Sequence, residues 1–211
     1  EAVRKVEEAG LAVAVHAIGD RANREVIGVF ARHAAGREHR VPHRIEHAQV
    51  IRPTDVERLA RLDVVASVQP IHVTDDIPLT DDSLGPRARF AYPFRDMLDA
   101  GVPLAFGSDA PVADPNPLWG IHAAVTRQKR NGTPEGGWYP GQRLTVAEAV
   151  WAFTMGPALA SGQQDVLGSI TPGKLADLVV LERDIFTIHT AEIHQVPVRM
   201  TLFDGEVVYE A

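Results

Sequence analysis

Three short apolar segments of this chain each lead to a side chain that can bind a metal ion. The first leads to His16, the second to His47 and the third to Asp109. Zinc and similar cations are held by imidazole nitrogens, carboxylate oxygens or thiolates, and the chain has no cysteine. The sequence therefore predicts a metal site made of two histidines and one aspartate.

A divalent cation held in this way would support hydrolysis. Coordination lowers the pKa of water from about 15.7 to about 7, which supplies hydroxide at neutral pH, and the cation stabilises a developing oxyanion. Asp109 would take the proton from the attacking water and pass it to the leaving amine. Gly107 and Pro111 flank this residue and are expected to fix the turn that aims it.

Each of these residues also has a structural interpretation. A histidine after an apolar run is more often a hydrogen-bonded core residue, and an aspartate before a proline-rich turn can cap a helix. Gln69, His72 and Asp75 follow a further apolar run and are candidates for contact with a substrate. Trp119 and Trp138 either line a pocket or anchor the loops that contain them.

Strand and helix patterns alternate over most of the chain. Continuous apolar runs predict strands, and apolar residues three or four positions apart predict helices. The predicted strands are residues 11–15, 43–47, 64–68 and 103–107, and the predicted helices are 21–35, 54–62, 90–100, 117–130 and 145–154. Parallel strands joined by helices meet at one edge by their carboxyl ends, so the proposed ligands are expected at a common rim.

Two further segments depart from this alternation. Residues 69–85 are polar and longer than an ordinary connection, which predicts a lid or substrate loop. After Gly168 the pattern changes to short strands, two of them joined by Asp204-Gly205, a typical hairpin turn. We therefore expect an α/β domain over residues 1–162 and a small β portion over 163–211.

Composition narrows the function classes. The chain has 211 residues, 45% of them hydrophobic and 23% charged, as in a soluble globular protein. Its net charge of −7, without a basic run, does not favour nucleic acid as a partner, and no stretch of about 20 apolar residues predicts a membrane span. The absence of cysteine predicts a cytoplasmic location.

An ordered set of motifs resembles the amidohydrolase superfamily, in particular its branch of hydrolases similar to N-acyl-amino-acid deacylases and to an exoenzyme regulatory protein. The motifs are V-H-A-I-G-D at 15–20, R-I-E-H-A-Q at 44–49, S-V-Q-P at 67–70, G-S-D-A-P at 107–111 and G-S-I-T-P-G-K-L-A-D-L-V-V-L at 168–181. Each motif alone is weak, but their order over the whole chain is specific.

The resemblance implies an eight-stranded TIM-like (β/α)8 barrel with one or two divalent metals at its C-terminal face. His16, His47 and Asp109 then match the ligands that close strands five, six and eight, and Asp109 also matches the proton shuttle. The family's His-x-His motif of strand one does not occur in the sequence. We therefore expect the second half of the barrel, strands five to eight, followed by part of a β-sandwich.

Three functions remain open at this level. The first is metal-dependent hydrolysis of a non-peptide carbon–nitrogen bond in a small-molecule amide, with zinc as the expected metal. The second is deamination or ester hydrolysis by the same fold, although Ala-Pro after Asp109 favours amides. The third is a catalytically incomplete module that pairs with another copy or with a missing N-terminal half, because a half barrel exposes sheet edges and apolar faces.

Overall fold

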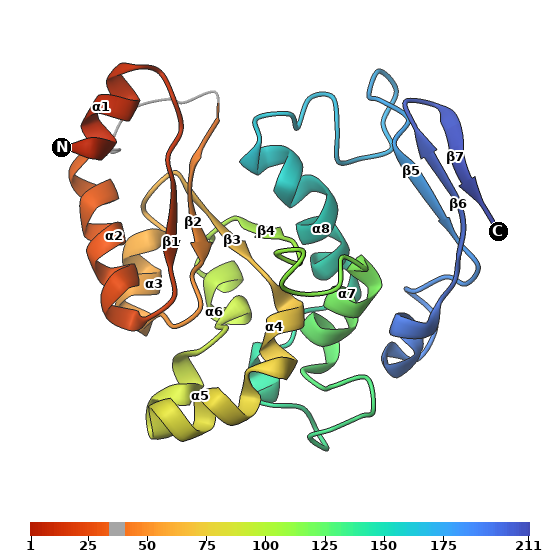
Figure 1. The fold of residues 1–211 in the computed structure, drawn as a ribbon, viewed down its shortest axis with the longest axis horizontal. Helices are drawn as coiled ribbons and strands as arrows, with labels where there is room; N and C mark the ends of the chain where they lie inside the picture. The colour runs from red at the N-terminus through yellow and green to blue at the C-terminus, as the bar shows by residue number, and fades with distance from the viewer. Residues whose placement is uncertain (34–40) are drawn as a thin grey trace.

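The computed structural model describes residues 1–33 and 41–211 and contains two separate sheets (Figure 1). The first sheet is parallel, and its strands follow one another in space as they do along the chain. They are β1 (Ala14–Ala17), β2 (His43–His47), β3 (Val64–Val68) and β4 (Leu104–Phe106). The α/β class with a parallel sheet is confirmed, whereas membership of a half barrel stays a prediction.

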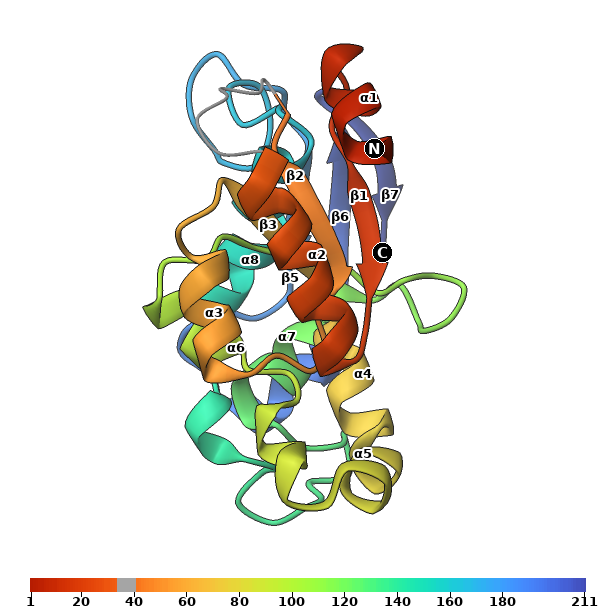
Figure 2. The same cartoon turned by 90° about the vertical axis from the view of Figure 1, so that its left-hand side faces the viewer.

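Helices connect these strands and cover the sheet, and α2 and α3 lie on the same side of it (Figure 2). The α-helices are α1 (Ala2–Glu8), α2 (Asp20–His33), α3 (Pro53–Leu59), α4 (Pro70–Asp75), α5 (Ile77–Leu84), α6 (Phe94–Asp99), α7 (Pro117–Thr126) and α8 (Val146–Ala160). Three short 3-10 helices are η1 (Gly85–Phe90), η2 (Pro140–Gln142) and η3 (Thr190–Gln195).

The second sheet is antiparallel and lies beyond α7 and α8 (Figure 1). Its strands are β5 (Leu178–Leu181), β6 (Val198–Phe203) and β7 (Glu206–Glu210), in that order. Asp204 and Gly205 both have positive φ, 50° and 82°, as a type I′ turn requires, so the predicted hairpin is confirmed. The boundary near residue 162 between two domains stays a prediction.

A buried histidine at the start of β2 fixes the path of the chain into β1. The side chain of His43 is fully buried and stacks on Phe30 at a centroid distance of 5.3 Å. Its Nδ1 accepts a hydrogen bond from the backbone N–H of Val13 at 2.9 Å, and its Nε2 lies 3.2 Å from Oε1 of Glu7. This one side chain therefore links α1, α2 and the first two strands.

Several predicted boundaries are wrong for identifiable reasons. The first strand begins at Ala14 rather than at residue 11, so His16 lies within it. The strand is also not buried on both faces, since only Ala17 of its four residues is buried. The Thr54 capping box is absent, since α3 begins at Pro53 and has no side-chain cap. Residues 69–85 form α4 and α5 rather than a loop.

A capping box begins α8, and a charge pair joins it to α6. Thr145 and Glu148 form the predicted capping box at its N-terminus. The Glu148 carboxylate also accepts two hydrogen bonds from Arg95, at 2.9 and 2.5 Å, and this guanidinium lowers the pKa of Glu148 to about 2. At the other end, the helix continues through Pro157 to Ala160, which is six residues beyond the predicted end at residue 154.

The described residues include no helix that is both long enough and apolar enough to cross a membrane.

The approach of α8 to β4 depends on a residue without a side chain. A Cβ atom at Gly156 would overlap the carbonyl oxygen of Leu104 and lie 3.0 Å from Cα of Ala105. We predict that Gly156→Ala lowers the free energy of unfolding by about 1–3 kcal/mol, because overpacking forces the helix off the sheet. Urea unfolding followed by circular dichroism measures this change.

The matched control is Gly28→Ala, also in a helix, where a Cβ meets only flexible arginine ends at 3.5 Å. This substitution should raise stability by about 0.5–1 kcal/mol, since alanine loses less backbone entropy on folding. Equal effects of the two variants would contradict the close packing of α8.

A pair of histidines joins α7 to η3. His122 is 2% exposed, and its ring lies 4.6 Å from that of His194. Burial, then the charges of His194 and Arg130, lower the pKa of His122 to about 4. Between about pH 4 and 6.5 the unfolded chain therefore binds more protons than the folded chain at this residue.

We predict that the contribution of His122 to the free energy of unfolding is fully present above about pH 6.5. The free energy of unfolding then falls by about 1–3 kcal/mol as the pH decreases to 4. Urea titrations at several pH values test this. His122→Gln should flatten the decline, whereas His33→Gln, at the end of α2, should leave it unchanged. A pH profile that is identical in all three proteins would show that His122 is not buried as a neutral ring.

Candidate active site

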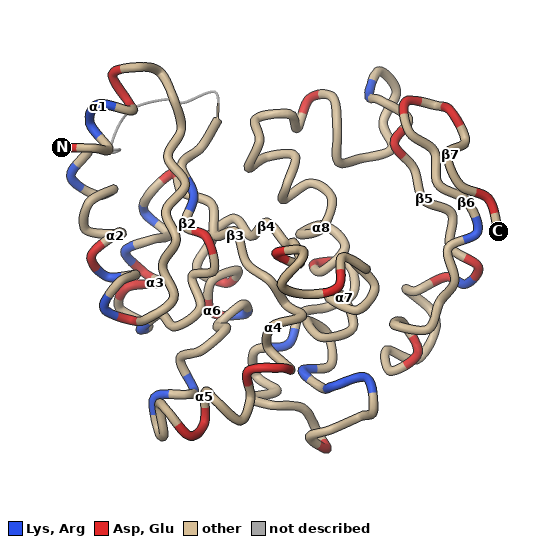
Figure 3. The backbone as a smooth tube through the Cα atoms, viewed as in Figure 1, with Lys and Arg blue, Asp and Glu red and all other residues tan. Residues whose placement is uncertain are grey.

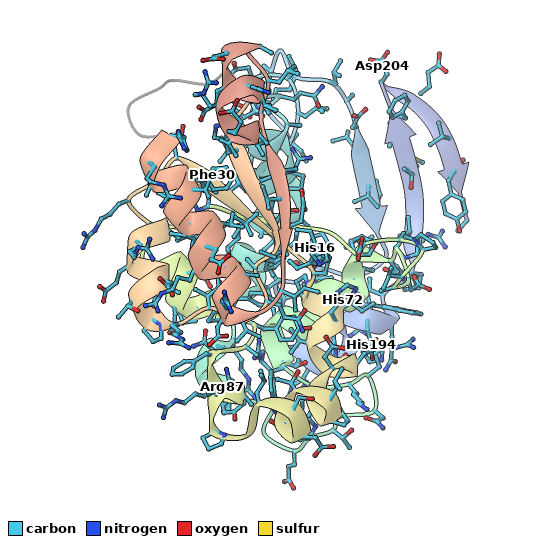
Figure 4. The ribbon with its side chains drawn as sticks, turned by 60° about the vertical axis from the view of Figure 1, so that its left-hand side comes forward. His16, Phe30, His72, Arg87, His194 and Asp204 are labelled. Carbon is cyan, nitrogen blue, oxygen red and sulfur yellow. The ribbon has the colours of Figure 1, made fainter. Side chains whose placement is uncertain are left out.

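The parallel register brings two of the predicted ligands together. His16 pairs in register with Glu46, and Ala17 pairs with His47, so the two histidines come from adjacent positions on β1 and β2. Their rings meet edge to face at a centroid distance of 4.5 Å. His16 lies toward the carboxyl end of β1, near His72 of α4 (Figure 4).

His47 is held in a fixed orientation by Gln69. Its Nδ1 lies 2.9 Å from Oε1 of Gln69, which is 7% exposed and follows β3 directly. The backbone adds a further constraint, since His47 and Ala48 have positive φ values of 73° and 42°. Left-handed backbone at two successive non-glycine residues is unfavourable, and such strain is concentrated at functional sites.

His72 extends this pair to three imidazoles. Its ring stacks against that of His47 at 6.4 Å, and its buried Nε2 has no hydrogen-bond partner among the described residues. It lies on α4, which begins immediately after Gln69. The structure therefore gathers His16, His47, Gln69 and His72 at one end of the parallel sheet.

Asp109 follows β4 and forms no hydrogen bond or ion pair with this group among the described residues. It is exposed, has a φ of 59°, and accepts a hydrogen bond from the N–H of Val112 through its backbone oxygen at 2.8 Å. Within residues 1–33 and 41–211, no set of three or more His, Asp or Glu side chains has the arrangement to hold a metal ion. The three-ligand set and the role of Asp109 stay predictions.

A buried polar network that the sequence did not reveal lies beneath α4. Asp76 accepts a hydrogen bond from Nε2 of Gln49 at 2.9 Å and another from the hydroxyl of Tyr92. Burial, then the bond to Asp76, raise the pKa of Tyr92, which is therefore a neutral donor. Arg127, fully buried, donates to the carbonyl oxygens of Tyr92 and Trp138, both at 3.0 Å.

A cavity of about 510 Å³ adjoins the histidine group along α4. Residues from α4, from the segment after β4, from α7 and from the segment after α7 line it, including Asp75 and Trp119. Asp75 is exposed and lies at this cavity, whereas Trp138 is buried and donates from Nε1 to Asp81. Of the two tryptophans considered from sequence, Trp119 lines a cavity and Trp138 anchors a loop.

The donor atoms fit a divalent cation of the zinc type in part. Two imidazoles in edge contact are a ligand pair that zinc uses, and the orphaned Nε2 of His72 is a further buried donor atom nearby. Among the described residues, no third His, Asp or Glu side chain completes a metal-binding group with this pair. Cation binding by His16 and His47 stays a prediction.

The chain is similar to longer known proteins. YtcJ of Bacillus subtilis (strain 168) is 35% identical over 211 residues, which cover 99% of this chain and 39% of that protein. The N-substituted formamide deformylase of Arthrobacter pascens is 39% identical over 119 residues, 56% of this chain and 21% of that enzyme. The chain thus spans well under half the length of these relatives.

A solved structure shows the same fold. An uncharacterized metal-dependent hydrolase from Pyrococcus horikoshii OT3 superposes with a TM-score of 0.75 and 31% identity, over 88% of this chain and 37% of that one. The family model described as "Amidohydrolase family" matches residues 1–209. Together with the end-of-strand histidines, this match over nearly the whole chain shows that the chain belongs to the amidohydrolase family.

Proposed function

We propose that this chain supplies the second half of a barrel hydrolase site that cleaves a carbon–nitrogen bond, other than a peptide bond, in a small-molecule amide. The observation that carries the proposal is the edge contact of His16 and His47 at 4.5 Å, at the end of adjacent parallel strands. The relative named as a formamide deformylase supports this reaction class. In this proposal β1 to β4 correspond to strands five to eight.

The residues take distinct roles. His16 and His47 hold a divalent cation, with zinc as the expected metal, and a bound cation would supply an activated water and polarise the substrate carbonyl. Asp109 moves the proton from water to the leaving nitrogen. His72 and Asp75, which lie along α4 beside the cavity, contact the substrate.

Gln69 decides which nitrogen of His47 is available. An amide oxygen only accepts, so the 2.9 Å contact makes Nδ1 of His47 the protonated nitrogen. The lone pair is then on Nε2, the atom left for a cation, as in metal sites where a second group fixes the tautomer. Gln69 is thus a positioning residue, and its effect is visible without metal.

A second candidate function rests on surface chemistry. The outer edge of β1 has no partner strand among the described residues, and Leu11 beside it is 60% exposed. The second sheet also exposes apolar side chains, among them Phe203 at 65%. Such surfaces associate with other chains. The second candidate is therefore a catalytically incomplete module that pairs with a copy or with a separate N-terminal half. For both candidates the cytoplasm is the expected location.

Zinc binding separates these candidates. We expect the purified chain to retain about one zinc equivalent after equilibrium dialysis, measured by mass spectrometry of the metal, with a loss of at least about tenfold in affinity for His16→Ala and His47→Ala. His33→Ala, a histidine at the end of α2, is the matched control. No zinc in the wild-type chain, even when its solution mass indicates a complex, would favour the incomplete module.

An activity panel then tests the reaction. Amides, an aminopurine and a carboxylic ester should be offered to the zinc-loaded chain, with a chelator as the negative control. Amide cleavage that Asp109→Asn lowers by about 10²–10⁴-fold supports the assigned proton transfer. Preference for the aminopurine or the ester would replace the amide hydrolase by the other reaction classes.

The orientation of His47 has its own test. We predict that long-range proton–nitrogen correlation spectra of the metal-free chain show His47 protonated at Nδ1, and that Gln69→Ala shifts the ring to mixed tautomers. Gln163→Ala, an exposed glutamine far along the chain, should leave the signals unchanged. Protonation at Nε2 in the wild type would contradict the role given to Gln69.

A further inference from the structure

The cavity beside the histidine group contains a positive charge that is fixed in position and unused. The guanidinium of Arg130 lies over the ring of Trp119, with Cζ 3.6 Å from the ring centroid, and both residues line the cavity. Stacking on an aromatic ring immobilises a guanidinium while leaving its N–H groups free to donate. No hydrogen bond or ion pair of the Arg130 side chain is found among the described residues.

Lys129, next to Arg130, also lines the cavity and has no hydrogen bond or ion pair from its ammonium group among the same residues. Figure 3 shows a basic stretch of the chain in the segment that follows α7. Two carboxylates, Asp75 and Asp114, share the cavity, and Asp114 already accepts the backbone N–H of Asn116 at 2.9 Å.

The positive charge of Arg130 reaches the cavity wall. His122 lines the cavity, and burial, then the charges of His194 and Arg130, lower its pKa to about 4. Burial is also the main cause of the lowered pKa of His194, with Arg130 again contributing. Both rings are therefore neutral at pH 7, which leaves Arg130 and Lys129 as the cationic groups there.

The position of the cavity connects it with the reaction. Ile71, Thr74 and Asp75 of α4 form part of its wall, and His72 of the same helix stacks on His47. A molecule with one end at the imidazoles thus reaches the cavity along a helix of only six residues. The apolar side chains of Ile71, Val112 and Trp119 would contact its middle.

We propose that this cavity binds an acidic group, a carboxylate or a similar oxyanion, at the far end of the amide substrate, and that Arg130 stacked on Trp119 determines this specificity. That the acidic group belongs to a substrate rests on the proposed function. Binding of an acid by the cavity does not require the reaction. A planar guanidinium binds a carboxylate through two parallel hydrogen bonds, which an ammonium cannot reproduce.

The test measures binding of succinate to the metal-free chain, followed by the indole N–H signal of Trp119 in proton–nitrogen spectra. We expect succinate to shift this signal and succinamide, its neutral analogue, to leave it unchanged. Arg130→Gln should weaken succinate binding by at least about tenfold, and Arg130→Lys should restore only part of it. Arg61→Gln, an exposed arginine after α3, is the matched control.

Two results would overturn the proposal: equal binding of succinate and succinamide, or equal succinate binding by wild type and Arg130→Gln. Arg130 is exposed, so its replacement should leave the fold intact, which circular dichroism verifies. His47→Ala should still bind succinate as the wild type does, because the cavity does not include His47.

The outcomes for the cavity and for the reaction are distinguishable. Succinate binding that depends on Arg130, in a chain that hydrolyses no amide, keeps the acid site and removes the proposed function. Amide hydrolysis with equal kcat/KM for acidic and neutral substrates, unchanged in Arg130→Gln, keeps the function and removes the acid site.

Discussion

The parallel pairing of β1, β2 and β3 is the constraint on which the candidate site depends. Backbone hydrogen bonds fix which residues are neighbours, and the register places Ala17 beside His47 and Glu46 beside both His16 and Ser67. A slip of one residue would turn each side chain to the opposite face of the sheet. The register alone places Glu46, not His47, beside His16 on the same face, so the contact of the two imidazoles also depends on the positive φ of His47, which departs from strand geometry. Buried residues such as Ile45 and Val68 hold this part of the main chain in place.

Around this framework the chain uses buried polar groups to hold segments that have no regular structure. Arg127 has a left-handed backbone and ends α7, and its guanidinium ties together the carbonyl groups of Tyr92 and Trp138. Burial lowers its pKa to about 9, so it remains charged at neutral pH, with the rings of Phe94 and Trp138 near the guanidinium. The same region carries the bonds from Tyr92 and Gln49 to Asp76, directly after α4. These bonds connect the ends of α7 and α4, two helices that contribute residues to the cavity wall.

Sequence patterns predicted the parts of this structure that depend on local periodicity. The predicted strands 43–47 and 64–68 have those bounds, the Thr145 capping box is present, and the Asp-Gly turn joins a hairpin. Predictions failed where tertiary contacts decide. The first strand is displaced because it is a sheet edge, and the 69–85 segment is helical because α4 and α5 are stabilised by packing at Val73 and Thr80.

The stacking of Arg130 on Trp119 and the burial of Arg127 have no sequence signal, since a charged residue after a helix is usually exposed. Convergence of His16 and His47 was predictable from strand ends, and a turn at Asp109 from its neighbours Gly107 and Pro111, whereas the positive φ of Asp109 was not.

The two sheets also imply different orders of assembly. The β6–β7 pair is closed by two residues, and hairpins of this kind form within about 1–10 μs. Each neighbouring pair in the parallel sheet is separated by a helical crossover, so its contacts close long loops, and chains dominated by such contacts fold more slowly. The histidine group, which exists only after three parallel strands have paired, is therefore expected to be among the last features to form as the polypeptide folds.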